Sequence, residues 1–314
     1  FRYYDLRIAE GITTSGQLSI RWIEKALNEY LNKLLNTDGE DYVIASDTDS
    51  VYIRFDELIN KVLKVREGES TDSYRGRAVD FLDTIAKQKI EPFIDSCYQD
   101  LATYVNAFEQ KMEMGREVIA DKGIWTAKKR YILNAWDVEG VRYQEPQLKI
   151  MGIEAVKSST PAPCREKIKE CLKIIMQGNE KDVNNFIQEF RKEFMELSPE
   201  EIAFPRSVNG IDKWSSGSNI FQSGTPMHCK GAILYNHFVK KQKLTGKYPL
   251  IQNGEKIKFL NMRTPNPMQS NVISFITKLP KELDIHKYLD YDKQYEKAFV
   301  EPLTFIMNQI GWNI

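Results

Sequence analysis

Apolar residues occupy most of 41–55 and are interrupted by a short acidic segment. They run up to Asp47-Thr48-Asp49-Ser50 and resume beyond it in Val51–Phe55, where apolar and polar positions roughly alternate. A period of two predicts half-buried strands, and a polar tetrad between two such runs predicts a tight turn. We therefore expect a β-hairpin whose turn carries Asp47 and Asp49.

Helical periodicity predicts a helix over 13–35 and a second long helix over 78–107. The first begins at a capping box made by Thr14 and Gln17, and the second is kinked or divided by Pro92. A short helix over 56–64 and a polar loop over 66–76 lie between them. The residues expected on the buried faces are Ile20, Ile23, Leu27, Tyr30, Leu31 and Leu34 in the first helix, and Phe81, Ile85, Phe93, Cys97, Leu101 and Val105 in the second.

Strand-like segments follow, with a turn at Glu139-Gly140; they cover 113–120, 130–135 and 141–143. Strands mixed with helices predict an α+β domain with an antiparallel sheet and helices packed on one face. A polar, proline-bearing segment, 158–163, then precedes a mostly helical second domain, and we place the boundary near residue 152. Its expected helices cover 164–177, 180–195 and 284–310, with a loop-rich section beyond 205 that contains Gly210, Gly217 and Gly224.

Composition indicates the class of protein, but the net charge gives no indication of a polyanionic partner. The 314 residues suffice for two domains, and Lys+Arg and Asp+Glu are equal at 44 each. Seven lysines and one acid nevertheless occupy residues 228–258, so a basic track can exist beside an acidic centre. The cysteines form no C-x-x-C pair, which indicates reduced thiols in a cytoplasmic protein, and no apolar run predicts a membrane span. His228, Cys229 and His237 fit no zinc spacing. The first residue is Phe1, which indicates a piece of a longer polypeptide.

Carboxylates at the hairpin are the first candidate site. In extended backbone Asp47 and Asp49 point the same way, and paired oxygen ligands suit Mg²⁺. The alternative is that Asp, Thr and Ser here are ordinary turn-forming residues. Glu117 lies in an expected strand of the same sheet and could supply a third carboxylate. Alternatively, it is an exposed strand residue paired with Arg116 or a lysine.

Cations form the second candidate site. Lys128, Lys129 and Arg130 precede Tyr131 at the start of an expected strand, where they must point to opposite faces. Trp125 and Tyr131 would offer stacking surfaces beside them. Lysine or arginine that reaches minor-groove acceptors or phosphates would hold a duplex without reading its sequence. The alternative is a solvated charge run. The polar track continues with Lys149, Lys157, Ser158, Ser159 and Thr160.

These two motifs resemble those of family B DNA polymerases. Asp47-Thr48-Asp49-Ser50 in a hydrophobic hairpin is similar to the family's third palm motif, and Lys128-Lys129-Arg130-Tyr131 to its K-K-R-Y motif. The resemblance extends to the replicative polymerases of T4-like bacteriophages over nearly the whole chain. The other similar segments are Phe1–Arg7, just after the fingers-helix motif, and Glu145–Gly152 with Ser158–Pro161, at the palm-to-thumb crossing.

The resemblance implies template-directed DNA synthesis by a two-metal mechanism with Mg²⁺. It gives Asp49 the role of bridging both ions, Asp47 that of a second carboxylate, and Glu117 an indirect supporting role. Lys129 would hold the minor groove at the primer terminus, with Lys128, Arg130 and Tyr131 beside it. Residues 1–152 would be the C-terminal part of the palm and 153–314 the thumb. The implied partners are primer–template DNA, deoxynucleoside triphosphates and the family's sliding clamp, in the cytoplasm of an infected bacterial host.

The sequence also departs from the family. Ala45-Ser46 stands where Tyr-Gly is usual, and the D-x-x-S-L-Y-P-S motif, the K-x-x-x-N-S-x-Y-G motif, the exonuclease carboxylates and an evident terminal clamp peptide are missing. We therefore expect the chain to need an N-terminal polymerase portion and to be inactive alone. One alternative is a non-catalytic palm–thumb remnant that binds duplex DNA. A reverse transcriptase is a weaker one, because such enzymes present adjacent aspartates, whereas Thr48 separates Asp47 from Asp49.

Overall fold

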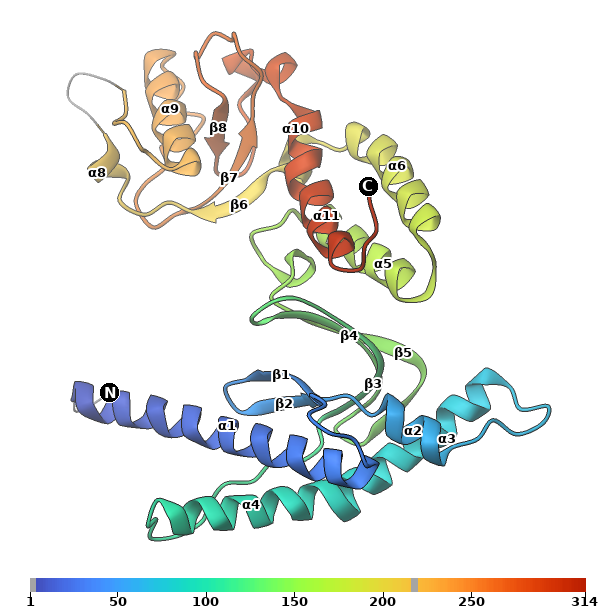
Figure 1. The fold of residues 1–314 in the computed structure, drawn as a ribbon. Coiled ribbons are helices and arrows are strands. Elements are labelled where there is room, and N and C mark those ends of the chain that lie inside the picture. Colours follow the sequence, from blue (N-terminus) through green and yellow to red (C-terminus); the bar gives the residue numbers. More distant parts are fainter. Residues whose placement is uncertain (1–3, 216–219) are drawn as a thin grey trace. The chain divides into compact units, whose positions relative to one another are not determined.

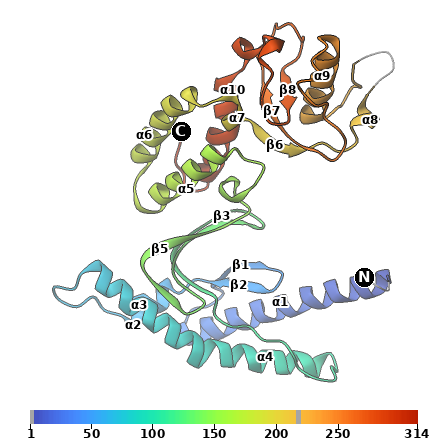
Figure 2. The same ribbon diagram turned by 180° about the vertical axis from the view of Figure 1, so that it is seen from behind.

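The computed structural model describes residues 4–215 and 220–314, which belong to two compact units (Figures 1 and 2). The first three residues of the Phe1–Arg7 segment, and Gly217 of the loop-rich section, lie outside the described residues. The structure is mixed α+β with three antiparallel sheets, so the predicted α+β class is confirmed. Unit 1 comprises Phe1–Lys122 and Asn134–Gln147, and unit 2 comprises Gly123–Leu133 and Leu148–Ile314.

Unit 1 is built on α1 (Leu6–Leu35), which begins earlier than its apolar periodicity predicted. The Asp5 side chain caps it by accepting a hydrogen bond from the Arg7 amide at 2.9 Å. The predicted capping box is wrong, because Thr14 lies mid-helix and its hydroxyl donates to the Glu10 carbonyl. Leu34, expected on the buried face, is 51% exposed. The buried residues of α1 are Ile23, Leu27, Leu31 and Leu35.

A helical segment interrupted by one π turn follows the short helix α2. This segment begins at Thr71, whereas the predicted helix began at residue 78, so part of the expected 66–76 loop is helical. The π turn ends at Ile90, two residues before Pro92, whose missing N–H removes a backbone hydrogen bond in this part of the helix. Pro92 thus divides the helix as predicted, whereas Val105 is wrong as a buried position, at 48% exposed. The bounds are α2 Asp56–Val62, α3 Thr71–Ile85, the π turn Ala86–Ile90 and α4 Glu91–Tyr104.

Five strands make two separate sheets in the first half of the chain. The predicted hairpin is a two-stranded sheet of its own, and the next three strands form a sheet in the order β3-β4-β5. The boundary between the units passes through all three of these strands. Glu139 and Gly140 form the predicted turn, both with positive φ. The bounds are β1 Val43–Asp47, β2 Ser50–Ile53, β3 Val118–Ala127, β4 Arg130–Val138 and β5 Val141–Met151.

The helices of unit 2 confirm the predicted pair near 164–195 and shorten the predicted final helix. That last segment begins at Tyr291 and not at residue 284, because two short 3-10 turns occupy the preceding residues. The bounds are α5 Ala162–Gln177, α6 Glu180–Glu196, α7 Pro199–Ile202, α8 Ile211–Trp214, α9 Met227–Lys241, α10 Tyr291–Tyr295, a π turn Glu296–Val300 and α11 Glu301–Asn308.

A three-stranded antiparallel sheet lies in the section predicted to be loop-rich. Its order is β6-β7-β8, with Phe204 opposite Phe259 and Lys258 opposite Phe275. Helix α9 packs closely on it, because a Cβ at Gly231 would come within 2.4 Å of the Ser274 hydroxyl. The bounds are β6 Phe204–Ser207, β7 Lys256–Asn261 and β8 Val272–Phe275.

Each unit has its own hydrophobic core, of which the core of unit 2 is the larger. In unit 1 the buried faces of α1 and α4 pack together and against the start of the hairpin. The four cysteines are free and buried, as expected for reduced thiols. Among the described residues, no helix is long and apolar enough to cross a membrane.

Candidate functional site

The acidic tetrad forms the turn between β1 and β2, as predicted. Asp47 is opposite Ser50 at the end of the ladder, so Thr48 and Asp49 form a two-residue loop. Thr48 has a φ of 57°, and the Asp49 amide donates to the Asp47 carbonyl at 2.6 Å. The expectation of extended backbone through Asp47–Asp49 is therefore wrong. The turn itself, and not strand alternation, sets the directions of the two carboxylates.

The base of the hairpin is fastened to α1 by one asparagine. The Asn28 side-chain oxygen accepts from the amides of Tyr42 and Val43, each at 2.9 Å. Farther along β1 the ladder register shifts between Val43 and Ala45, leaving Ile44 as a bulge. Because α1 is itself fixed by its buried face, these bonds hold the start of β1 firmly against unit 1.

The residues that replace the usual Tyr-Gly lie between this bulge and the turn. Ser46 donates to a Glu24 carboxylate oxygen of α1 at 3.4 Å, a bond that glycine could not make. At the tip, the Thr48 hydroxyl donates to a carboxylate oxygen of Asp47 at 3.0 Å. The substitution of Tyr-Gly thus leaves the hairpin formed and adds a contact between β1 and α1.

Asp49 is solvent-exposed at the turn, where its carboxylate is accessible to a cation. Its charge acts on a buried tyrosine of α4. Burial raises the pKa of the Tyr98 hydroxyl, and the charges of Asp49 and Asp95 raise it further.

Glu117 lies just before β3 and is exposed, so two predictions about it are wrong. It is not within a strand, and the neighbouring sheet β3-β4-β5 does not include the hairpin. Its backbone carbonyl accepts a hydrogen bond from the Glu139 amide at 2.7 Å, which fixes its main chain at the β4–β5 turn.

A buried charge network that the sequence analysis missed begins one residue earlier. The Arg116 guanidinium forms ion pairs with Asp137 and Asp83, and Asp137 also accepts from Arg142 at 3.3 Å. Asp137 is 2% exposed. Burial opposes its ionisation, but hydrogen bonds from Arg116 and Arg142 more than offset this, so the pKa of Asp137 lies below its usual value. The network joins α3 to the sheet and fixes the segment that carries Glu117.

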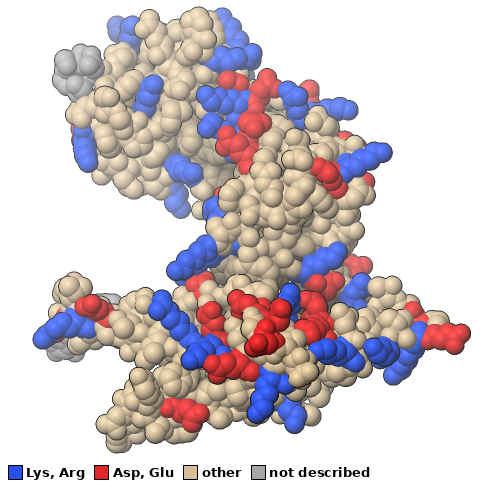
Figure 3. All heavy atoms as spheres, in the orientation of Figure 1, with Lys and Arg blue, Asp and Glu red and all other residues tan. Residues whose placement is uncertain are grey.

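Two carboxylates at the hairpin are the metal-binding groups that the described residues offer there. Across residues 4–215 and 220–314, no three His, Cys, Asp or Glu side chains are grouped to hold a metal ion. Asp47 and Asp49 nevertheless supply the hard oxygen donors that Mg²⁺ prefers, and Mg²⁺ usually takes one or two carboxylates and completes its shell with water and phosphate. On the face drawn in Figure 3, acidic side chains of unit 1 gather into a group bordered by lysines and arginines.

Lys128 and Lys129 belong to unit 2 and form the turn between β3 and β4. The prediction that three cations enter a strand is therefore wrong for two of them, since only Arg130 begins β4. Both lysines are exposed, and Lys129 has a φ of 60°. The turn thus presents two adjacent ammonium groups at the surface of the unit.

Arg130 and Tyr131 contribute to the packing beneath this turn. Arg130 donates to Glu154 at 2.8 Å, and its guanidinium lies 5.4 Å from the ring centroid of Phe305. Tyr131 is 6% exposed, with its ring 6.4 Å from that of Trp125. The expectation of an exposed stacking surface at Tyr131 is wrong in this respect.

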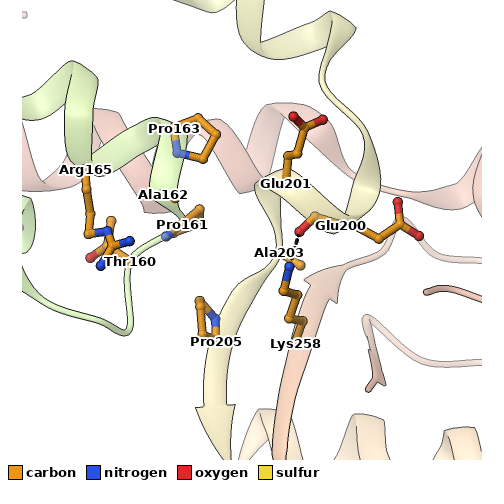
Figure 4. Close-up of a pocket in the computed structure, with 10 residues that line it drawn as sticks. All are labelled: Thr160, Pro161, Ala162, Pro163, Arg165, Glu200, Glu201, Ala203, Pro205 and Lys258. Carbon is orange, nitrogen blue, oxygen red and sulfur yellow. Dashed lines mark hydrogen bonds between the residues drawn. The ribbon is translucent and has the colours of Figure 1, made fainter. Parts of the chain in front are cut away.

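The remaining residues of the predicted polar track differ in exposure. Lys149 on β5 is half-buried, Ser158 is exposed, and Thr160 is 5% exposed. The Ser159 carbonyl accepts from Arg206 at 3.3 Å. Thr160 lies on the wall of a pocket of about 340 Å³, drawn in Figure 4. Its other lining residues are Pro161, Ala162, Pro163, Arg165, Glu200, Glu201, Ala203, Pro205 and Lys258.

Comparison with known proteins shows that the sequence of this chain is similar to those of two phage DNA polymerases. No family model matches the chain. It is 41% identical over 316 residues to the DNA-directed DNA polymerase of Escherichia phage RB69, an alignment that covers 96% of this chain and 34% of that protein. It is 39% identical over 324 residues to the DNA-directed DNA polymerase of Enterobacteria phage T4. That alignment covers 99% of this chain and 35% of the T4 protein.

The chain is a homologue of these phage DNA polymerases. The resemblance found in the sequence is thereby confirmed, since identity near two in five residues extends over nearly the whole chain. The chain spans about a third of the length of the polymerases it matches. It therefore corresponds to part of a family B polymerase.

Proposed function

We propose that the chain is the palm–thumb part of a phage DNA polymerase and carries half of its metal-binding carboxylates. The observation that supports this most strongly is the Asp47-Thr48-Asp49-Ser50 turn, formed at the tip of β1–β2 in a homologue of the RB69 and T4 enzymes. The proposed reaction is template-directed transfer of a deoxynucleotide to the primer 3′-hydroxyl. The proposed palm part is residues 1–152 and the proposed thumb 153–314.

In this proposal Asp49 bridges the two metal positions and Asp47 is the second carboxylate. Mg²⁺ bound there would lower the pKa of the primer hydroxyl and neutralise charge on the triphosphate. Asn28 holds the base of the hairpin, and the two-residue loop presents Asp49 at its exposed tip. Fixed acids of this kind lose little freedom on binding their ligand.

Glu117 has an indirect part in the proposed site. Its main chain is held by the Glu139 amide, and the adjacent Arg116 is locked between Asp83 and Asp137. These contacts fix the main chain at Glu117, and in this proposal its carboxylate supports the site without ligating metal itself.

The Lys128–Lys129 turn is the proposed contact to primer–template DNA. Two exposed ammonium groups suit phosphates and minor-groove acceptors, and neither contact depends on sequence. Arg130 and Tyr131 support the turn from below through Glu154, Phe305 and Trp125. We include Lys149, Ser158, Ser159 and Thr160 in the same track as a proposal from the sequence.

The rest of a polymerase must complete the site, since the chain spans about a third of its relatives. The test is primer extension by a chimera in which this chain replaces the matching segment of RB69 polymerase, compared with this chain alone. We expect synthesis by the chimera and none by the chain alone. Synthesis by the isolated chain at a comparable rate, or no synthesis by a folded chimera that binds duplex, would contradict the proposal.

The second candidate is a non-catalytic palm–thumb remnant that binds duplex DNA. The observation in its favour is that no third acidic or other metal-binding side chain joins Asp47 and Asp49 within the described residues. A folded chimera that binds primer–template normally but extends no primer is the result that this candidate predicts.

A further inference from the structure

The first half of α1 carries an exposed apolar face. Three large apolar side chains on one side of the helix are solvent-exposed there, in contrast to the buried face farther along the helix. They are Ile8 at 62% exposure, Ile12 at 64% and Leu18 at 40%. We call these three residues the α1 stripe.

The members of the α1 stripe lie on one side of the helix. At about 100° per residue they fall within an arc of about 120°. The residues between them on that arc, Gly11, Ser15 and Ser19, are uncharged. An uncharged apolar arc of this width is what a helix presents to a packing partner and not to water. In Figures 1 and 2 the first turns of α1 extend past α4 and the β1–β2 hairpin.

The α1 stripe continues an interface that already exists in unit 1. Trp22 follows on the same arc, and its indole donates to the Cys97 carbonyl of α4 at 3.1 Å. The Trp22 ring lies 5.4 Å from that of Tyr104, which is itself 72% exposed. The α1–α4 packing thus stops where the exposed apolar surface begins, and a further element could extend it without interruption.

We propose that the α1 stripe is the surface on which the remainder of the polymerase docks. This rests on the proposed function, in which polypeptide outside this chain completes the active site. The relatives are about three times as long as their matched segments, and the proposed function assigns the unmatched two thirds to a partner of this chain. An exposed apolar surface in continuity with a core is a typical contact for such a partner.

Binding of the unmatched part of RB69 polymerase tests the proposal. That probe is the RB69 polypeptide without the segment aligned to this chain, and its complex with the full chain is measured by sedimentation and biolayer interferometry. Ile8→Lys combined with Ile12→Lys should weaken binding by about tenfold or more, because two charges would be buried without partners. Since both side chains are exposed, the variant should fold normally, which circular dichroism checks.

Leu6→Lys is the matched control. Leu6 is 64% exposed, as Ile12 is, but lies on the opposite side of the helix. Its replacement should leave binding within about twofold.

Three results would overturn the proposal. The first is that the Ile8→Lys, Ile12→Lys variant binds the RB69 polypeptide as tightly as the wild-type chain does. The second is that the wild-type chain does not bind it. The third is that the wild-type chain self-associates and the variant does not, which would make a second copy the occupant. The readout is complex formation. The covalently joined chimera tests synthesis separately, so failure of the docking surface and failure of the proposed function can be told apart.

Discussion

The backbone of Gly152 lies directly against the carbonyl of Lys129. A Cβ at position 152 would come within 2.2 Å of that oxygen, and Gly152 has a φ of 66°. Both the close approach and the left-handed conformation require glycine. The end of β5 therefore supports the turn that carries Lys128 and Lys129, and no side chain can be accommodated between them.

Gly152→Ala should destabilise unit 2 by more than its backbone conformation alone accounts for. A left-handed alanine costs about 1 kcal/mol, and relief of the clash with the Lys129 carbonyl adds to that. Gly254→Ala is the control, because Gly254 also has positive φ, 85°, but has open space around it. Denaturant unfolding monitored by circular dichroism should give the larger loss for Gly152→Ala. Equal losses would show that the close approach is unimportant.

Lys129→Ala should weaken duplex binding by a similar factor on different sequences. Phosphate and minor-groove contacts carry little sequence information, and losing one phosphate contact reduces the salt dependence of binding by about one unit of slope. Fluorescence anisotropy with several primer–templates at varied salt measures both quantities. Lys192→Ala, at an exposed lysine of α6 outside the predicted track, is the control. A loss confined to one sequence would indicate direct base readout instead.

Asp137→Asn should cost unit 1 about 3 kcal/mol, because it leaves the largely buried Arg116 guanidinium without one of its charged partners. Asp80→Asn, at the exposed partner of Arg142, should cost about 0.5 kcal/mol or less. Urea unfolding of both variants makes the comparison. Similar losses of unfolding free energy in the two variants would show that burial of the network does not increase its contribution to stability.

The Asp137 contribution should also depend on pH in one direction. Its pKa is lowered from the ordinary 3.8, so the folded state holds the ionised form more strongly than the unfolded chain does. The stability advantage over Asp137→Asn should be complete above the unfolded value and shrink as pH falls through the folded pKa. An advantage that grows on acidification would contradict the assignment.

Local patterns predicted the elements whose signals are local. The alternation around Asp47–Ser50 identified the hairpin and its turn, and the periodicity of Ile23, Leu27 and Leu31 identified α1. The start of α1 could not be found in this way, since its first turns bury nothing and only the Asp5 cap marks the beginning. Pattern reasoning therefore placed the start at the nearer capping signal.

Contacts between distant residues were beyond the same reasoning. The β6–β7 pairing joins Phe204 to Phe259, and no repeat or turn motif connects those segments. The Arg116–Asp137 ion pair likewise depends on how the segment before β3 meets β4. The Lys128–Lys129 turn was missed for another reason, because left-handed turn positions usually carry glycine or asparagine and not lysine.

Nucleotidyl transfer by Asp49→Asn in the RB69 chimera tests the central claim most directly. Asparagine keeps the size of the side chain but removes the charge that two metal ions would share. We expect loss of primer extension with primer–template affinity within about twofold of the unmutated chimera. Asp38→Asn, the same change at an exposed carboxylate outside the hairpin, should leave extension intact. Extension by Asp49→Asn at the rate of the Asp38→Asn control would remove Asp49 from the catalytic site.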